Sequence, residues 1–153
     1  MNTESALTID AILPHRGRMM LLDAFHEYSA EHVICGVTIH AGSMFCDGVN
    51  GVPAWVGLEY MAQTVCAFSG FEEVRAGSAP SIGLLLGTRG YECSAEWFPL
   101  GARLLVRADL LMRDENNLVA FACTIHDHES LLARSDLKAY RPKDVHALVG
   151  GSR

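Results

Sequence analysis

The stretch PAWVGLEYMAQTVCAFSG at residues 53–70 determines how the rest of this chain folds. Apolar residues occur on nearly every side of a helix drawn through it, and such a helix is usually buried. Pro53 fits the first helical turn, where its missing N–H costs nothing. Gly70 fits the position just after the C-terminus. We therefore predict a central, buried helix over residues 53–70.

One charged residue, Glu59, interrupts this apolar stretch. At about 100° per residue, it lies on one helical stripe with Trp55, Ala62 and Cys66. A buried carboxylate is costly unless it is paired, protonated or beside a solvated cavity. We therefore interpret Glu59 as functional. The alternative is that Glu59 reaches the helix rim and meets water, as most glutamates do.

The stretch also approaches the length of a membrane span, which needs at least about 17 residues. Glu59 and Gln63 lie near its middle and strand-like sequence follows it, so we expect no membrane span. No segment has the charged start, apolar middle and cleavage site of a signal peptide. The cysteines are odd in number, scattered and never in a CxxC pair, which predicts free thiols and a cytoplasmic protein. They are Cys35, Cys46, Cys66, Cys93 and Cys123.

The composition indicates a single globular domain over residues 1–153, with a loose tail at 143–153. Half of the chain is apolar, which is enough for a sizeable core. The net charge of −6 argues against nucleic acid, which favours a basic surface. The run His126-Asp127-His128 has ligand types for a metal but no evident third ligand, and neighbours in a turn usually face solvent. We predict no metal and no cofactor.

The sequence on both sides of the central stretch is strand-like. In HVICGVTIH at residues 32–40 every second residue is apolar, which predicts one buried face. After a polar connection at 71–80, a long strand is expected over 81–98, bent near Gly87 or Gly90. The three strand-like runs that follow it are closely spaced, which predicts an antiparallel meander. Alternate residues of these runs are expected to face the core: Leu104, Val106, Ala108, Leu110, Met112, Val119, Phe121, Cys123, Ile125, Leu131, Ala133, Leu137 and Ala139.

The expected order is therefore two strands, one long buried helix and about four strands. A flat sheet covers one side of a helix, whereas a strongly curved antiparallel sheet can wrap around it. We predict this α+β architecture. Its edge strands need cover, which a dimer that continues the sheet would provide.

Three motifs in this order resemble those of the hotdog-fold 3-hydroxyacyl (acyl-carrier-protein) dehydratases. LPHR at 13–16, followed by MMLLDAF, resembles the LPHR…LLVD opening of that family. LEYMAQ at 58–63 resembles its central helix, and FPLGARLLV at 98–106 resembles one of its strand entries. VPAWVGLEYMAQ and LLGTRGYEC are most similar to the dehydratase-like proteins of aryl polyene gene clusters. The resemblance covers about residues 10–142 and implies a hotdog fold, a curved sheet around one central helix.

The resemblance implies loss of water from a 3-hydroxyacyl thioester of acyl carrier protein or coenzyme A, in a homodimer or a hotdog heterodimer. This chemistry needs a base for the α-proton, an acid for the leaving hydroxyl and a donor for the thioester oxygen. By resemblance, Glu59 matches the helix acid and Gln63 a supporting glutamine. Ala54 matches the glycine at the helix start, so the backbone N–H of Ala54 or Trp55 would polarise the thioester carbonyl.

The histidine that this family carries in the loop before the helix is missing. An ungapped alignment from Glu59 places Phe45 at its position, and residues 41–58 contain no histidine. His40 at a strand end and Asp47 in the loop are the two candidates to replace it. Each has an ordinary alternative, a solvent-exposed histidine for His40 and a turn-forming aspartate for Asp47.

Three functions remain open from the sequence. The first is a dehydratase of fatty acid or aryl polyene-type lipid biosynthesis. The second, supported by the missing histidine, is a non-catalytic acyl-binding hotdog subunit that partners a typical dehydratase. The third is an acyl thioesterase, because one fold can host both chemistries. His15 and Arg16 of the LPHR motif are expected to brace the N-terminal segment.

Overall fold

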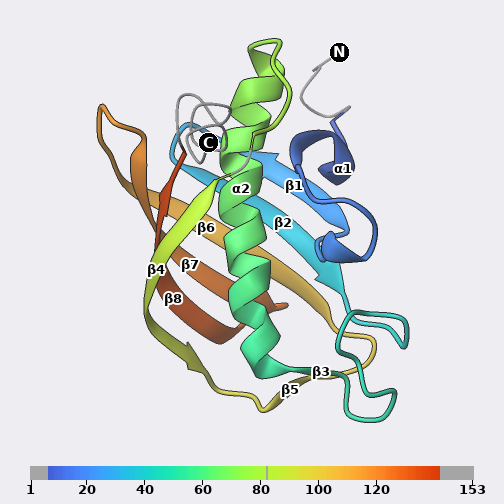
Figure 1. Cartoon of the computed structure of the whole chain (residues 1–153). Helices are drawn as coiled ribbons and strands as arrows, with labels where there is room; N and C mark the ends of the chain where they lie inside the picture. The colour runs from blue at the N-terminus through green and yellow to red at the C-terminus, as the bar shows by residue number, and fades with distance from the viewer. Residues whose placement is uncertain (1–6, 82, 142–153) are drawn as a thin grey trace, which may run out of the picture.

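The computed structural model describes residues 7–81 and 83–141 and follows the expected order of elements (Figure 1). The helices are α1 (Ile9–Ile12) and α2 (Gly57–Arg75), with the 3-10 turns η2 (Gly17–Met19) and η3 (Ala54–Val56). The strands are β1 (Ala24–Tyr28), β2 (His32–Thr38), β3 (Val52–Pro53), β4 (Leu84–Cys93), β5 (Trp97–Phe98), β6 (Arg103–Arg113), β7 (Leu118–Asp127) and β8 (Ser130–Tyr140). The tail predicted at 143–153 lies outside the described residues.

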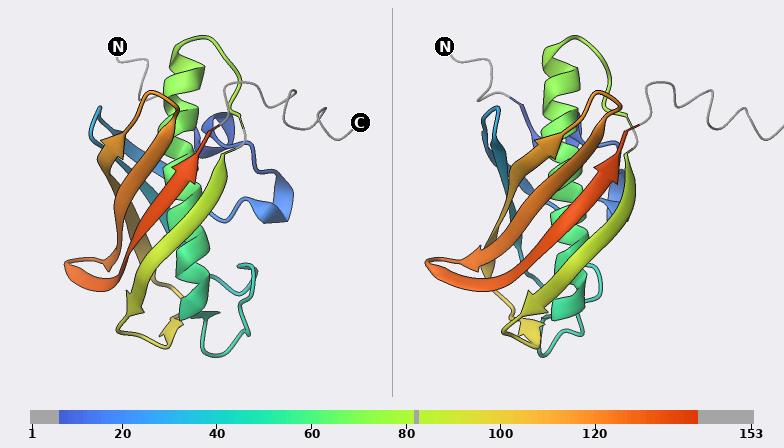
Figure 2. Two further views of the ribbon diagram at one scale, coloured as in Figure 1. Left: turned by 60° about the vertical axis from the view of Figure 1, so that its left-hand side comes forward. Right: turned by 90° about the vertical axis from the view of Figure 1, so that its left-hand side faces the viewer.

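Six strands form one antiparallel sheet in the order β1-β2-β6-β7-β8-β4, and β3 pairs with β5 separately. β6, β7 and β8 form the predicted meander. The sheet curves around α2, which packs against β2, β6, β7 and β8 (Figure 2). A curved antiparallel sheet wrapped around one long helix is the architecture that the sequence predicted.

The alternation of apolar residues predicted the buried faces of β2 and β7. Val33, Cys35 and Val37 of β2 are buried, as are the four predicted residues of β7. Two predicted core residues, Met112 and Leu131, are instead 43% and 49% exposed. Both are separated from the rest of their strand by a register shift, which comes just before Met112 on β6 and just after Leu131 on β8. A shift of one residue reverses the alternation, so side chains on its two sides face opposite to what a regular strand predicts, which explains both errors.

The central helix begins and ends later than predicted. Pro53, expected in the first helical turn, belongs to β3, and the α-helix starts at Gly57 after η3. Gly70 does not end it. Residues 71–75, expected in a polar connection, continue the helix. Gly70 lies where α1 crosses α2, and a Cβ at this position would lie 1.7 Å from the carbonyl oxygen of Ile12. Gly70 is therefore a residue of close approach between two helices.

The C-terminus of α2 is formed by Gly77, seven residues further along the chain than the predicted stop. Gly77 has φ +89°, a conformation that glycine adopts at little cost. Its N–H donates to the carbonyl of Val74, and the N–H of Ser78 donates to the carbonyl of Glu73. These two bonds form a Schellman motif, which satisfies carbonyls that a helix end leaves free.

β4 is an edge strand of the sheet and bends twice. Its register against β8 shifts between Leu85 and Gly87 and again between Arg89 and Glu92, close to both predicted bend sites. Leu85 and Leu86 are 46% and 59% exposed. The edge of the sheet therefore presents apolar side chains to solvent in the single chain.

The cysteines and the helices bear on two further expectations, free thiols and the absence of a membrane span. All five cysteines are free thiols there, as predicted. None of the helices within residues 7–81 and 83–141 is long and apolar enough to cross a membrane.

We predict that Gly70→Ala destabilises the protein, although alanine is the better helix former by about 1 kcal/mol. The new Cβ would meet the carbonyl oxygen of Ile12 at 1.7 Å, so α1 must move. Overpacking of this kind typically costs about 1–3 kcal/mol. Urea denaturation should show a lower midpoint with an unchanged slope.

Ser69→Ala is the matched control, because Ser69 precedes Gly70 on a less buried side of the helix. It should change the free energy of unfolding by no more than about 0.5 kcal/mol. A Gly70→Ala variant as stable as the original chain would show that α1 does not pack this closely on α2.

Candidate active site

One side of α2 is not covered by the sheet (Figure 1). Glu59 of α2 is exposed. Trp55 is 62% exposed, Glu59 is exposed, and Ala62 and Cys66 are partly buried. These four residues form the stripe predicted around Glu59. The prediction that this stripe is buried is wrong for the single chain, because the sheet wraps only the opposite side of the helix.

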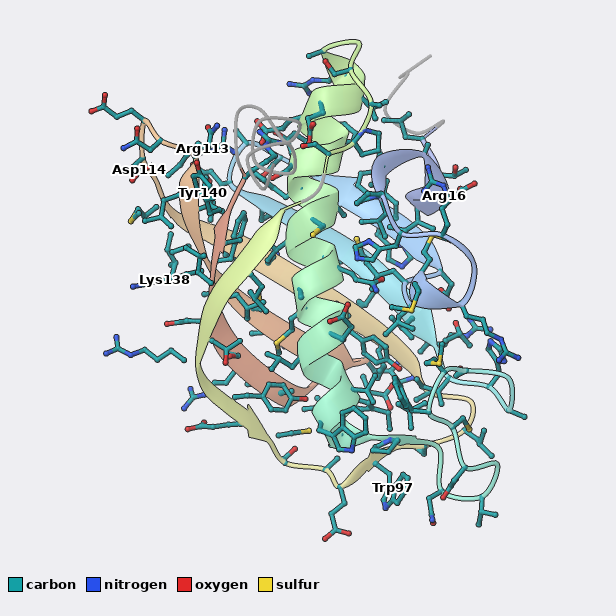
Figure 3. All side chains as sticks on the ribbon, in the orientation of Figure 1. Arg16, Trp97, Arg113, Asp114, Lys138 and Tyr140 are labelled. Carbon is teal, nitrogen blue, oxygen red and sulfur yellow. The ribbon has the colours of Figure 1, made fainter. Side chains whose placement is uncertain are left out.

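A cavity of about 170 Å³ lies along this stripe, and Glu59 lines it. We call it the Glu59 cavity. Its base is α2, one wall is the loop that carries His15, and the other wall comes from β4, β7 and β8. Figure 3 shows Arg16, the neighbour of His15, and Tyr140 of β8 on opposite sides of α2. Its lining includes His15, Glu59, Gln63, Cys66, Tyr140 and Arg141.

The two ends of the Glu59 cavity are both polar. Glu59 and Ser69 both line it and are ten residues apart, or about 15 Å along a helix. At the Ser69 end, Arg141 donates to the carbonyl of Ser69 at 3.3 Å and pairs with Glu73 at 2.6 Å. Between these ends the lining includes Val65 and Leu85. The cavity is therefore a slot with an apolar middle. Among the described residues, no cation is paired with its carboxylate, Glu59.

Gln63 joins Glu59 to the N-terminal segment. Its side chain is 1% exposed. The amide nitrogen donates to the carbonyl of Met19 at 2.7 Å and to Oε1 of Glu59 at 3.2 Å. The amide oxygen accepts the N–H of Leu21 at 2.9 Å. One buried amide therefore orients the Glu59 carboxylate and fixes the segment that closes one wall of the cavity.

The start of the central helix is held by close packing. The hydroxyl of Tyr91 donates to the carbonyl of Ala54 at 2.6 Å. A Cβ at Gly57 would lie 2.3 Å from that hydroxyl, so only glycine fits there. The N–H of Ala54 donates to the carbonyl of Glu96 at 3.0 Å, as an extension of the β3–β5 ladder. Two backbone N–H groups, those of Ala54 and Trp55, were predicted to polarise a thioester carbonyl. Because the N–H of Ala54 already donates to Glu96, the N–H of Trp55 is the better candidate.

Phe45 occupies the loop position where the family histidine was expected. It has φ +68° and is 53% exposed. Its ring centroid lies 5.1 Å from that of Trp55, a distance typical of packed aromatic pairs. The loop therefore presents an aromatic pair at the helix start, on the same open side as Glu59.

His40 does not line the Glu59 cavity. It lies at the edge of a separate cavity of about 650 Å³, together with Tyr60 and Phe45. Nδ1 of His40 accepts the N–H of Gly42 at 3.0 Å, so in the neutral ring the proton lies on Nε2. The structure therefore does not bring His40 and Glu59 into one cavity of the same chain.

Asp47 organises its own loop. Oδ1 accepts the N–H groups of Val49, Asn50 and Gly51 at 2.9, 2.7 and 3.1 Å, and Oδ2 accepts the Asn50 amide at 2.9 Å. The bond from Val49, followed by those from Asn50 and Gly51, lowers the pKa of Asp47 to about 2. A carboxylate used in this way is a weak base, so the contacts favour the turn-forming interpretation of Asp47.

His15 is the residue that sequence analysis did not place in the site. It lines the Glu59 cavity, and within the described chain its buried Nδ1 atom has no hydrogen-bond partner. Burial lowers the pKa of His15, and the nearby charge of Glu59 opposes that shift. The LPHR motif was the available signal, but only the fold shows that its histidine lines the same cavity as the helix acid.

Metal binding finds no support in the described residues. They contain no group of three His, Cys, Asp or Glu side chains that could hold a metal ion. In the run 126–128, Nε2 of His128 lies 3.8 Å from Asp127 in an exposed turn.

Comparison with known proteins identifies the family. A family model described as ApeP-like, ApeP dehydratase, matches residues 7–150. A solved structure of the dehydratase heterocomplex ApeI:P from Xenorhabdus doucetiae matches with 29% identity and a TM-score of 0.84, over 96% of this chain and 99% of that one. The curated proteins gave no match.

More distant structures share the fold alone. An uncharacterized protein from Pyrococcus horikoshii matches with 8% identity and a TM-score of 0.65, over 90% of this chain and 96% of that one. A hypothetical thioesterase with coenzyme A from Streptococcus pneumoniae matches with 8% identity and a TM-score of 0.57, over 76% and 85%. The predicted hotdog fold and the predicted family are thus confirmed.

We predict that Gln63→Met loosens the N-terminal segment. The change leaves the carbonyl of Met19 and the N–H of Leu21 without their partner. A buried polar group left unsatisfied costs about 1–3 kcal/mol, so urea denaturation should show a loss of that order. Amide hydrogen exchange should be faster at Leu21. Glu59→Gln, which keeps both bonds, is the control and should change stability by about 0.5 kcal/mol or less.

We predict that the Asp47 loop stays ordered at pH values where ordinary carboxylates protonate. Its pKa is about 2, below the usual 3.8. Because the pKa of Asp47 is lower in the folded chain than in the unfolded chain, its charged form stabilises the loop at pH values above the unfolded-state pKa. This stabilisation is lost as the pH falls through the folded-state pKa. The amide shifts of Val49 and Gly51 should therefore change near pH 2 in an NMR titration. A shift change centred near pH 4 would contradict the lowered pKa of Asp47. The same change near pH 2 in Asp47→Asn would also contradict it, because that variant has no carboxylate at this position.

Proposed function

Because the chain belongs to the ApeP-like dehydratase family, we propose that it takes part in dehydrating 3-hydroxyacyl thioesters in aryl polyene biosynthesis. The observation that carries this proposal is the placement of Glu59. It lies on the open side of the central helix, lines the Glu59 cavity and is oriented by the buried amide of Gln63. Positioning of this kind is what a proton-transfer group requires.

Glu59 has the role of general acid in this reaction. Its proton moves to the 3-hydroxyl group of the substrate, the C3–O bond breaks and water leaves. A base removes the proton from C2, and the double bond forms between C2 and C3. The N–H of Trp55 at the helix start stabilises the negative charge that develops on the thioester oxygen.

The substrate is an acyl group on acyl carrier protein or coenzyme A. The apolar middle of the Glu59 cavity suits an acyl chain, and its open side gives the thioester a way in. Free cysteines throughout the described chain fit a reducing compartment, so we assign the protein to the cytoplasm.

The working form is a hotdog dimer, and we favour a heterodimer. The exposed stripe of α2 and the apolar edge of β4 both need cover, and a second hotdog chain would cover them together. The similar Xenorhabdus doucetiae structure is a dehydratase heterocomplex. Cover on that side would also exclude water from Glu59, which strengthens electrostatic effects there.

The second catalytic group was expected at His40 or Asp47. His40 lines a different cavity from Glu59, so it can complete the site only from another copy of the chain. Asp47 commits both carboxylate oxygens to its loop. These contacts direct attention to a histidine of a partner chain or to another residue of this chain.

We predict that Glu59→Gln lowers the rate of dehydration by about 10²–10⁴-fold, the usual contribution of a general acid. The amide keeps the shape of the side chain and cannot deliver the proton. The assay follows the α,β-unsaturated thioester formed from a 3-hydroxyacyl thioester, with and without a partner hotdog protein. Glu115→Gln, in an exposed turn, is the control and should leave the rate unchanged.

The same assay separates the alternatives. Full activity in Glu59→Gln would show that the site is wrongly assigned. A chain that is active only after a partner is added supports the heterodimer, and if Glu59→Gln is then as active as the original chain, the partner carries the catalysis. Release of free thiol without dehydration would identify a thioesterase instead.

A further inference from the structure

We propose that Arg141 recognises the far end of the acyl chain, so that the protein selects 3-hydroxyacyl thioesters whose chain ends in a neutral hydrogen-bonding group such as a hydroxyl. This inference rests on the proposed dehydratase function and names its substrate class. The observation that carries it is the polar end of the Glu59 cavity beside Ser69, which the elimination of water does not use.

The groups assigned to the reaction determine the direction of the acyl chain. The N–H of Trp55 is assigned to the thioester oxygen, and Glu59 to the hydroxyl on C3. Trp55 lies in η3, directly before α2, and Glu59 lies in the first turn of α2. The rest of the chain therefore continues past Cys66 towards Ser69, along the side of the helix that lines the cavity.

The apolar part of the cavity suits an extended chain of limited length. Glu59 and Ser69 are about 15 Å apart along the helix. An extended chain advances about 1.2 Å per bond, since a residue of three backbone bonds spans about 3.5 Å. About twelve bonds beyond C3 therefore bring the end of the chain from the apolar lining to the polar groups.

The polar end of the cavity is a poor place for a methyl group. Arg141, Ser69 and Ser81 line it. A methyl group placed there would remove water from these groups and return no hydrogen bond, which costs free energy. A hydroxyl group would replace the water that it displaces, because its oxygen accepts a hydrogen bond from an N–H group.

Arg141 is held in place by the C-terminal part of α2. Its Nη1 donates to the carbonyl of Ser69 at 3.3 Å and to Oε1 of Glu73 at 2.6 Å. The same Oε1 accepts the N–H of Ser81 at 3.3 Å. The backbone N–H of Arg141 donates to the carbonyl of Asn117 at 3.3 Å. The guanidinium is therefore ordered before a substrate arrives, which lowers the entropic cost of binding.

Arg141 can still donate to a substrate. Both of its side-chain contacts use Nη1, whereas a guanidinium has five N–H groups. Within residues 7–81 and 83–141, these contacts leave Nε and Nη2 without a hydrogen-bond partner. Because Glu73 balances the charge of Arg141 and would repel an anion, the site favours a neutral acceptor over a carboxylate.

The first test compares two 3-hydroxyacyl thioesters that extend about twelve bonds beyond C3 and end in a methyl or a hydroxyl group. It uses the full chain, with its hotdog partner where activity requires one. The hydroxyl-ended substrate should have a kcat/KM higher by about 10-fold or more, as expected for one hydrogen bond to a charged group. Equal values would overturn the proposal, as would a carboxylate-ended substrate that is better than both.

The second test changes the recognising residue. Arg141→Lys keeps a cation beside Glu73 and removes the planar fork of N–H groups. It should largely abolish the preference for the hydroxyl-ended substrate and leave kcat/KM for the methyl-ended one nearly unchanged. Arg134→Lys is the matched control, because Arg134 is an exposed arginine of the same strand, and it should keep the preference. An Arg141→Lys variant with the full preference would overturn the assignment.

The third test measures binding without turnover. Acyl thioesters of the same length that lack the 3-hydroxyl group cannot be dehydrated, and their affinities are compared by calorimetry. The hydroxyl-ended thioester should bind about 10-fold more tightly to the original chain and to Arg134→Lys, but not to Arg141→Lys. Equal affinities for the original chain would overturn the recognition by Arg141. This binding preference without dehydration of any 3-hydroxyacyl thioester would support that recognition and contradict the proposed function.

Discussion

A single curved sheet can cover only part of the circumference of the helix that it encloses, and this constraint shapes the whole molecule. α2 carries apolar residues on almost every side, yet only the side toward β2, β6, β7 and β8 is packed by the sheet. α1 crosses it at Gly70, where the absence of a side chain permits contact. What is left is the open stripe that contains Glu59.

The open stripe connects folding to function. An apolar stripe of this length is unfavourable in water, so it favours a second chain, and the same surface carries the ionisable group proposed for catalysis. Gln63 has a part in both, because its amide anchors the N-terminal segment and orients Glu59. Assembly and proton transfer would therefore depend on the same few residues, since covering the stripe also removes water from the site.

The sequence predicted the features that depend on local pattern and missed those that depend on distant contacts. Alternation identified the buried faces until a bulge reversed them, as at Met112 and Leu131. Gly70 looked like a helix end, because a glycine of close approach and a terminal glycine are identical in sequence. The motifs located Glu59 and Gln63, but the position of His15 beside them depends on contacts across more than forty residues of chain.

The chemistry explains how a site of this kind can form although this chain lacks the loop histidine. Elimination of water fixes where a base must lie relative to C2 and C3 of the substrate, and places no condition on the segment that supplies it. In this fold the LPHR loop and the loop before α2 are both adjacent to the central helix. Phe45 then packs on Trp55 at the helix start, which a charged or polar ring would do less well. A base from a partner chain would meet the same requirement beside Glu59, so the loss of the loop histidine is compatible with catalysis in a heterodimer.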